Sequence, residues 1–362
     1  AAFMQLSPRK YIYVDPSTGE LITANTFYAS TMANPNLKWE STTSWNAGMD
    51  LTFLQGRLST SVDVYKKITT DLLVSRELPS LIGYSSVMSN IGEVQNTGVE
   101  LSLNSTNIRT DKFIWRTSLN LAYNKNKITH LYGIMEDVKD ADGNVIGQRE
   151  ADDIKNKRFI GHDIDEIWDY KVVGIWQEED REEAAKYGQQ PGDVHLLDKD
   201  MNYKYDNTDK EFQGTRMPRL RWSMRNDFTL FKNLNISFNM YSYIGHKQSL
   251  ARFTNDNALL NVTNQIKCDY WTPENRNNEY PRLANKKPAG VSYSIYKNAS
   301  FLRFDNISIG YTFPKKLIEP LRIQNLNVNA TMKNAGYISG WPGYDPENSD
   351  KNTPRVIYFG IN

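Results

Sequence analysis

The chain has 362 residues, with 43 lysines and arginines against 42 aspartates and glutamates, and a net charge of +1. This balance argues against a nucleic-acid-binding protein, because such proteins carry basic patches that match the phosphate backbone. The mean hydropathy is −0.61, and the sequence contains no run of the roughly 18 apolar residues that a membrane-spanning helix needs. These values remain compatible with a transmembrane β-barrel, because only every second residue of its strands faces lipid.

The first predicted strand covers residues 39–53 and shows a strict two-residue alternation. The large apolar side chains all lie at odd positions, from Trp39 through Trp45 to Phe53, whereas the even positions between them carry polar side chains or glycine. A strand of a soluble β-sandwich is typically about 5–6 residues long. An alternation of this length, with aromatic side chains near both ends, is typical of a tilted membrane-spanning strand.

The same alternation recurs along the chain, between connections of two very different lengths. The connections at 55–56 and 232–233 are tight turns, whereas those at 129–161, 177–215, 245–299 and 334–354 are long. Short turns at one end and long loops at the other are typical of outer-membrane barrels. The sequence therefore predicts an all-β fold, a transmembrane antiparallel β-barrel with long extracellular loops. We predict about ten strands: the one above, one near residues 164–176, and those at 58–65, 99–104, 115–124, 221–230, 234–241, 301–313, 325–332 and 355–362.

Eight short motifs occur in an order that resembles the SusC/RagA family of TonB-dependent outer-membrane transporters. They cover nearly the whole chain from Asn34, and their shared order makes the resemblance specific although each motif alone is weak. The motifs are NPNLKWE at 34–40, NIGEVQNTGVE at 90–100, NLAYNKNK at 120–127, GIWQ at 174–177 followed by PGDV at 191–194, YWTPEN at 270–275 with YPR at 280–282, ASFLRFDNISIGYTFP at 299–314, GYDPE at 343–347 and PRVIYFGI at 354–361.

The resemblance implies a barrel of about 22 strands with a plugged lumen, located in the bacterial outer membrane. We expect residues 1–362 to be the C-terminal part of this barrel, with the signal peptide, N-terminal extension, TonB box and plug lying outside the chain. The family implies a SusD-like surface lipoprotein as a lid, coupling to the TonB complex through the missing part, and a possible dimer of transporter–lid pairs. The expected activity is active import of a nutrient, a glycan rather than a peptide.

Two groups of residues are candidates for substrate binding. Arg221 and Arg225 occupy polar positions of a predicted strand and would face the barrel lumen. Aromatic side chains in the loops would stack on sugar rings or contact the lid, and the alternative is that they anchor the loops. These aromatic candidates are Trp168, Tyr170, Trp176, Trp271 and Trp341.

A loop with regularly spaced acidic residues is a weak candidate for calcium binding. Family members often carry an Asp-rich loop after the Gly-Asp-Val motif, and it resembles an EF-hand calcium loop. In this chain oxygen ligands occur at relative positions 1, 3, 5, 9 and 12, but Tyr203 replaces the turn glycine and the last ligand is an aspartate. The alternative is a solvated polar loop. The candidate ligands are Asp198, Asp200, Asn202, Asp206 and Asp209.

No catalytic constellation is evident, because the four histidines are scattered and no phosphate-binding loop or nucleophile motif occurs. We therefore expect a transporter and not an enzyme. Two alternatives remain open. A secreted soluble β-sandwich that binds carbohydrate would fold in water without detergent when residues 34–362 are expressed, and a passive porin would lack a plug and a TonB box upstream.

Overall fold

The computed structural model describes residues 5–77, 81, 84, 86–250, 269–348 and 351–362. Two compact units can be distinguished. Unit 1 contains Ala1–Ala47, Tyr65–Thr97 and Lys125–Ile164, and unit 2 contains Gly48–Val64, Gly98–Asn124 and Asp165–Asn362. Among the described residues, neither helix has the length and apolar character needed to cross a membrane.

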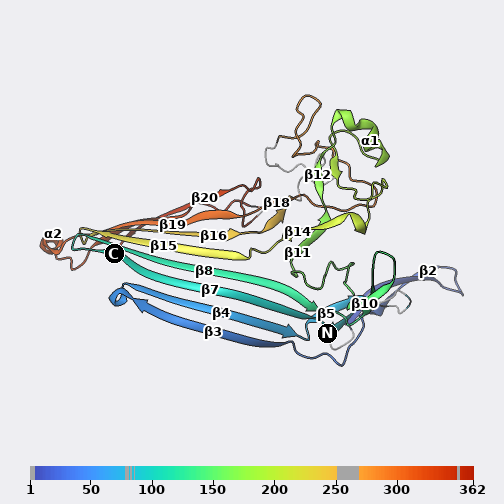
Figure 1. Cartoon of the computed structure of the whole chain (residues 1–362), viewed down its shortest axis with the longest axis horizontal. Coiled ribbons are helices and arrows are strands. Elements are labelled where there is room, and N and C mark those ends of the chain that lie inside the picture. The colour runs from blue at the N-terminus through green and yellow to red at the C-terminus, as the bar shows by residue number, and fades with distance from the viewer. Residues whose placement is uncertain (1–4, 78–80, 82–83, 85, 251–268, 349–350) are drawn as a thin grey trace. The chain divides into compact units, whose positions relative to one another are not determined.

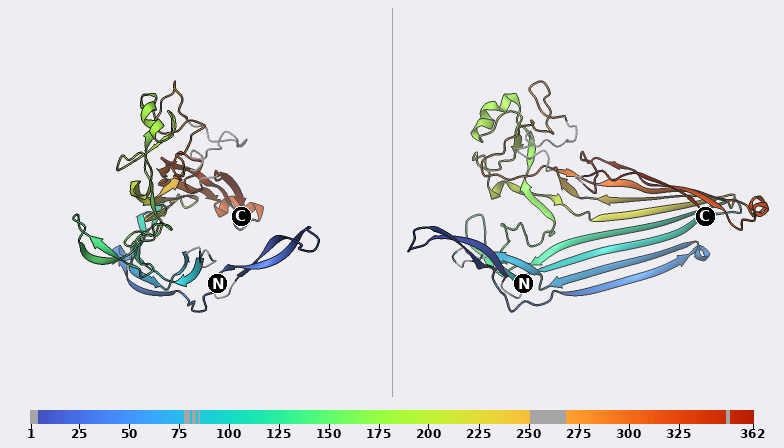
Figure 2. Two further views of the ribbon diagram at one scale, coloured as in Figure 1. Left: turned by 90° about the vertical axis from the view of Figure 1, so that its right-hand side faces the viewer. Right: turned by 180° about the vertical axis from the view of Figure 1, so that it is seen from behind.

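A nine-stranded sheet is the main element of the fold, with the strand order β21-β20-β19-β16-β15-β8-β7-β4-β3. Its strands run side by side in both Figure 1 and Figure 2. Each strand pairs with the wall strands that precede and follow it in the chain, as expected of a β-meander. The strands are β3 (Ser41–Phe53), β4 (Leu58–Thr70), β7 (Glu93–Arg109), β8 (Phe113–His130), β15 (Leu220–Leu230), β16 (Leu234–Ile244), β19 (Phe301–Thr312), β20 (Asn327–Ser339) and β21 (Val356–Ile361).

The pairing of β15 with β8 and β16 confirms the predicted alternation. Met224 lies opposite Leu119 and Met240, so that one face of these strands is apolar. Arg225 lies opposite Ser118 and Asn239 on the other face, which is polar. The register is continuous along the whole β15–β16 pair, so each side chain stays on the face that its position in the sequence predicts.

Asn226 is the exception on the apolar face of β15, and its hydrogen bonds explain why it is tolerated there. The residue is 4% exposed. Its Oδ1 accepts hydrogen bonds from Trp115 Nε1 at 2.9 Å and from Thr117 Oγ1 at 2.7 Å. A buried amide without such partners would destabilise the fold, whereas here it links β8 to β15.

Replacing Asn226 tests this link. We expect Asn226→Leu to lower the free energy of unfolding by about 1–3 kcal/mol, because the Trp115 and Thr117 donors lose their acceptor. Denaturant unfolding of the full-length protein in detergent measures this change. The combined variant Trp115→Phe with Asn226→Leu should recover part of the loss, and a double variant less stable than Asn226→Leu would contradict the explanation.

The short predicted turns are confirmed. Leu54–Gly56 joins β3 to β4, and Gln55 has a left-handed backbone with φ of 55°. Phe231–Asn233 joins β15 to β16, with φ of 52° at Phe231 and 68° at Lys232. Tight turns with positive φ reverse the chain without disturbing the alternation of the flanking strands.

The predicted strand near 164–176 does not belong to the nine-stranded sheet. Residues 166–170 form β11 (Glu166–Tyr170), which pairs with β14 (Lys210–Thr215), and β12 (Val172–Ile175) pairs with β13 (Val194–Leu196). Four successive residues of β11, from Ile167 to Tyr170, are buried. A strand covered on both faces cannot present one of them to lipid, and so this segment belongs to a packed loop region.

The remaining elements lie outside the nine-stranded sheet: the first hairpin precedes β3, and the others lie in connections between wall strands. Unit 1 contains the hairpins β1 (Gln5–Val14) with β2 (Leu21–Thr31), β5 (Leu73–Glu77) with β6 (Ser86–Asn90), and β9 (Met135–Lys139) with β10 (Val145–Glu150). Unit 2 contains β17 (Lys247–Ser249) paired with β18 (Tyr296–Asn298), and the helices α1 (Arg181–Lys186) and α2 (Lys315–Ile318).

Candidate functional site

A groove of about 480 Å³ lies on the polar face of the sheet in unit 2. A groove of this volume is in the range that binds small ligands or part of a larger one. Strands β4, β7, β8, β15 and β16 each contribute lining residues. The charged and aromatic members on the polar positions are Asp63, Glu100, Arg221, Tyr241 and Tyr243. The rest of the lining consists of serines and asparagines together with Leu101, Leu121, Ala122 and Trp222.

The two arginines predicted to face the lumen have different surroundings. The Arg221 guanidinium lines the groove and lies 5.2 Å from the centre of the Tyr243 ring. Arg225, two positions further on, pairs with Asp227 at 2.7 Å. Arg221 can therefore combine a charge-assisted hydrogen bond with an aromatic surface, whereas the charge of Arg225 is already matched.

The sequence analysis did not single out Tyr241 and Tyr243. Both occupy polar positions of the alternation in β16, and their rings lie 5.6 Å apart. Ser223 and Arg221 of β15 lie directly opposite them in the register. Their place on the predicted lumen face, across from Arg221, was the signal that could have identified them.

The five loop aromatics predicted to contact substrate are buried inside the loop region of unit 2. Trp168 is 9% exposed, Tyr170 6%, Trp176 3%, Trp271 5% and Trp341 7%. Tyr170, Trp271 and Trp341 pack in one apolar cluster with Val194 and Leu196. All five side chains thus take part in the packing of the loop region, and their contact with a substrate stays a prediction.

Hydrogen bonds fix two of these rings. Trp176 Nε1 donates to Gln189 Oε1, and Trp271 Nε1 donates to Gln177 Oε1, each at 3.0 Å. The Trp176 ring also stacks on His195, with 3.5 Å between ring centres. Burial lowers the pKa of His195 below its ordinary value, which favours the neutral imidazole in this stack.

Asp193 connects two segments of the loop region that are about ninety residues apart in the chain, the one around residue 193 and the one at residues 282–286. Its side chain is fully buried and pairs with Arg282 Nε at 2.7 Å. Its oxygens also accept the backbone N–H groups of Lys286 at 2.9 Å and of Gln190 at 3.0 Å. The PGDV motif at 191–194 is therefore tied to the segment that follows the YPR motif at 280–282.

Three of the predicted calcium ligands lie together. One carboxylate oxygen from each of Asp198, Asp200 and Asp209 lies within 4.8 Å of the others. Asp206 is outside this group, and its Oδ1 accepts from the Thr208 N–H at 2.7 Å. Asn202 Oδ1 accepts from the Lys204 N–H at 2.7 Å.

The backbone of this loop makes a sharp turn without glycine, because Tyr203 adopts a left-handed conformation with φ of 63°. Partial burial raises the pKa of Asp198, but hydrogen bonds from the Tyr187 hydroxyl and the Tyr203 N–H outweigh this effect and lower it. The pKa of Asp200 is raised by lost hydration and by the neighbouring Asp198 carboxylate. The two neighbouring carboxylates therefore differ in acidity, with the pKa of Asp198 lowered and that of Asp200 raised.

The sequence was compared with known proteins. A family model described as "TonB dependent receptor-like, beta-barrel" matches residues 12–335. TonB-dependent receptor SusC of Bacteroides thetaiotaomicron is 30% identical over 355 residues, which cover 92% of this chain and 33% of SusC. TonB-dependent receptor P3 of Formosa agariphila is 29% identical over 328 residues, which cover 88% of this chain and 32% of P3. The chain therefore spans about a third of the length of these relatives.

Solved structures of a RagAB peptide transporter share the fold. One matches with a TM-score of 0.69 at 21% identity, covering 99% of this chain and 38% of that chain. Another, in an "open-open" state, matches with a TM-score of 0.70. The sheet of the described residues has β3 and β21 as its edges, so it is an open part of a barrel wall. The chain belongs to the TonB-dependent receptor β-barrel family, and it is an outer-membrane protein of the SusC/RagA type.

Proposed function

We propose that this chain is part of a transporter that imports a nutrient across the outer membrane in a TonB-dependent manner, with a SusD-like lipoprotein as its lid. The observation that carries the proposal is the polar groove on the inner face of the wall. Arg221, Tyr243 and the neighbouring amides can bind a polar cargo reversibly, and import requires no chemistry on that cargo.

We propose a glycan as the cargo, in preference to a peptide. Tyr241 and Tyr243 line the groove together with the amide side chains of Asn120 and Asn239, and aromatic and amide groups of this kind can contact a hydroxyl-rich ligand. The RagAB structures come from a peptide transporter, and so peptides are the second candidate.

Growth experiments with the full-length gene test this function. A deletion strain should fail to grow on at least one glycan that the wild type uses, and growth should return on complementation. Removal of TonB should have the same effect, because an energised transporter needs it, whereas uptake that persists without TonB would favour a passive porin. Unchanged growth of the deletion strain on every glycan and peptide mixture would contradict the proposal.

We also propose that Asp198, Asp200 and Asp209 bind Ca²⁺. Three carboxylates with oxygens this close supply the hard, anionic ligands that calcium prefers, and carbonyl groups or water would complete the usual six to eight ligands.

Removing calcium should destabilise the loop. We expect millimolar Ca²⁺ to raise the melting temperature of the full-length protein and EDTA to lower it, because a ligand bound only by the folded state stabilises it. The shift should disappear in Asp200→Asn and persist in Asp206→Asn, which lies outside the carboxylate group. An equal shift in both variants would contradict the site.

A further inference from the structure

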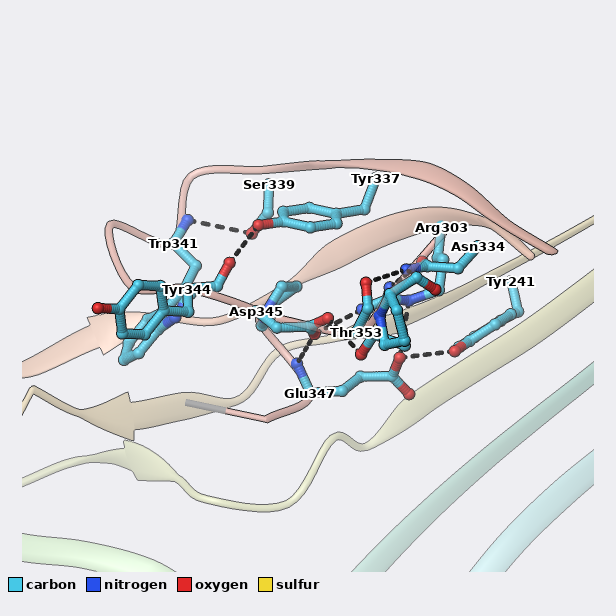
Figure 3. Close-up of polar contacts among 12 residues, drawn as sticks. Tyr241, Arg303, Asn334, Tyr337, Ser339, Trp341, Tyr344, Asp345, Glu347 and Thr353 are labelled. Atoms are coloured by element: carbon cyan, nitrogen blue, oxygen red, sulfur yellow. Dashed lines mark hydrogen bonds and ion pairs between the residues drawn. The ribbon is translucent and has the colours of Figure 1, made fainter. Parts of the chain in front are cut away.

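A network of polar side chains with two buried members, Arg303 and Asp345, holds residues 341–347 against β16, β19 and β20 (Figure 3). At its centre is Arg303 of β19, whose side chain is 3% exposed and pairs with the 1% exposed Asp345 at 2.5 Å. Arg303 Nη1 donates to Asn334 Oδ1 at 2.6 Å. We call these residues, together with Tyr241, Glu347 and Thr353, the Arg303 network.

Asp345 makes the most extensive polar contacts of the 341–347 segment. It accepts hydrogen bonds from Thr353 Oγ1 at 2.8 Å and from the Glu347 N–H at 2.9 Å. Burial alone would raise the pKa of Asp345, but these bonds and the Arg303 guanidinium lower it overall. Breaking such a buried pair would be strongly destabilising, and so we expect this contact to stay intact.

Glu347 is held less firmly. Its side chain is 31% exposed, and its Oε2 lies 2.8 Å from Arg303 Nε. The same oxygen accepts a hydrogen bond from the Tyr241 hydroxyl at 2.6 Å. Arg303 pairs with two carboxylates, Asp345 and Glu347, and its single positive charge compensates only one of the two negative charges. The hydrogen bond from Tyr241 therefore adds to the stabilisation of the Glu347 carboxylate.

Tyr241 belongs to both the Arg303 network and the groove. In the register it lies between Ser223 of β15, which also lines the groove, and Arg303 of β19. A phenol has one hydroxyl proton to donate. An oxygen atom of a ligand in the groove can therefore accept this proton only in competition with Glu347.

We propose that Tyr241 couples ligand binding in the groove to the stability of the 341–347 segment, through its hydrogen bond to Glu347. A ligand oxygen, from a sugar hydroxyl or a peptide carbonyl, takes the Tyr241 hydrogen bond. Glu347 is then held only by its ion pair with Arg303 Nε and moves into solvent more readily, while Asp345 stays paired with Arg303. The coupling rests on the proposed function, because the ligand is the cargo of the transporter.

The release is local, because other contacts hold the middle of the segment. Gln248 Nε2 donates to the carbonyl of Pro346 at 2.6 Å, and the Tyr337 hydroxyl donates to the carbonyl of Tyr344. Neither of these two bonds involves Tyr241 or Glu347. The expected change is therefore a loosening of the Glu347 end and not unfolding of the loop.

Hydrogen exchange of the full-length protein in lipid nanodiscs tests the coupling. Tyr241→Phe keeps the ring in the groove but removes the hydroxyl, and we expect exchange at residues 341–348 to accelerate about tenfold or more, as for the loss of a hydrogen bond to a charged group. Glu347→Ala should accelerate it at least as much, because this change also removes the ion pair with Arg303 Nε. The double variant should add little beyond Glu347→Ala, since the Tyr241–Glu347 hydrogen bond is then already absent. The matched control is Tyr243→Phe, which also lines the groove and should leave this exchange unchanged.

The ligand arm uses maltoheptaose and a tryptic digest of casein as probes. One of them should accelerate exchange at 341–348 in the wild type and not in Tyr241→Phe. Additive effects of Tyr241→Phe and Glu347→Ala, or no response to either probe, would overturn the coupling. Growth on glycans and peptides is measured separately, so loss of the coupling and failure of the proposed import can be told apart.

Discussion

Trp271→Ala should unfold the loop region of unit 2 rather than weaken cargo binding alone. Trp271 is 5% exposed, belongs to the main apolar cluster and donates a hydrogen bond to Gln177. Its ring also packs on Gly192, where an added Cβ would lie 2.5 Å from Trp271 Cε3. Truncating a buried tryptophan costs about 3–5 kcal/mol, since it leaves a cavity.

Limited proteolysis of the full-length protein in detergent measures this effect. A loss of about 3–5 kcal/mol would increase cleavage in the loop region by two orders of magnitude or more, if opening is fast relative to cleavage. Trp45→Ala is the matched control, because Trp45 is 70% exposed on β3 and should not change cleavage there. If Trp271→Ala left the stability of the loop region unchanged but abolished glycan binding, Trp271 would instead be a substrate contact.

Asp193→Ala should have an effect of similar size for an electrostatic reason. The side chain is fully buried and pairs with Arg282, which is 23% exposed. Removing one partner of a buried ion pair costs about 3–5 kcal/mol, because the remaining charge loses its compensation. The N–H groups of Lys286 and Gln190 also lose their acceptor.

The same proteolysis assay distinguishes this pair from an ordinary surface ion pair. Glu183→Ala is the matched control, because Glu183 pairs with Lys186 on α1 with both side chains largely exposed, and such pairs contribute only about 0–1 kcal/mol. Equal cleavage in Asp193→Ala and Glu183→Ala would show that Asp193 does not anchor the loop region.

The barrel wall was predictable because its pattern is local. In a pleated strand successive side chains point to opposite faces, so the alternation of Trp39–Phe53 and of residues 221–230 identifies both the strand and its apolar face. The tight turn at 55–56 follows from the same pattern. Even Asn226, which interrupts it, leaves the face assignment intact because Trp115 and Thr117 satisfy its amide.

The loop region was not predictable in the same way. Trp168, Tyr170 and Trp271 look like exposed loop aromatics in the sequence, but residues distant in the chain contact them. Lys210 lies over the Trp168 and Tyr170 rings, and Trp271 donates a hydrogen bond to Gln177. The sequence also predicts a wall strand near residues 164–176, because β-forming residues indicate a strand but not its partner. In the structure the partners are β14 and β13, outside the nine-stranded sheet.

The sequence alone determined the architecture, the family and the apolar and polar faces of the wall, because a two-residue period and a series of collinear motifs are properties of the chain itself. Only the tertiary structure decided which side chains are available to a ligand. Burial, the groove around Arg221 and the bond from Tyr241 to Glu347 all depend on contacts between distant segments, and no local pattern encodes such contacts.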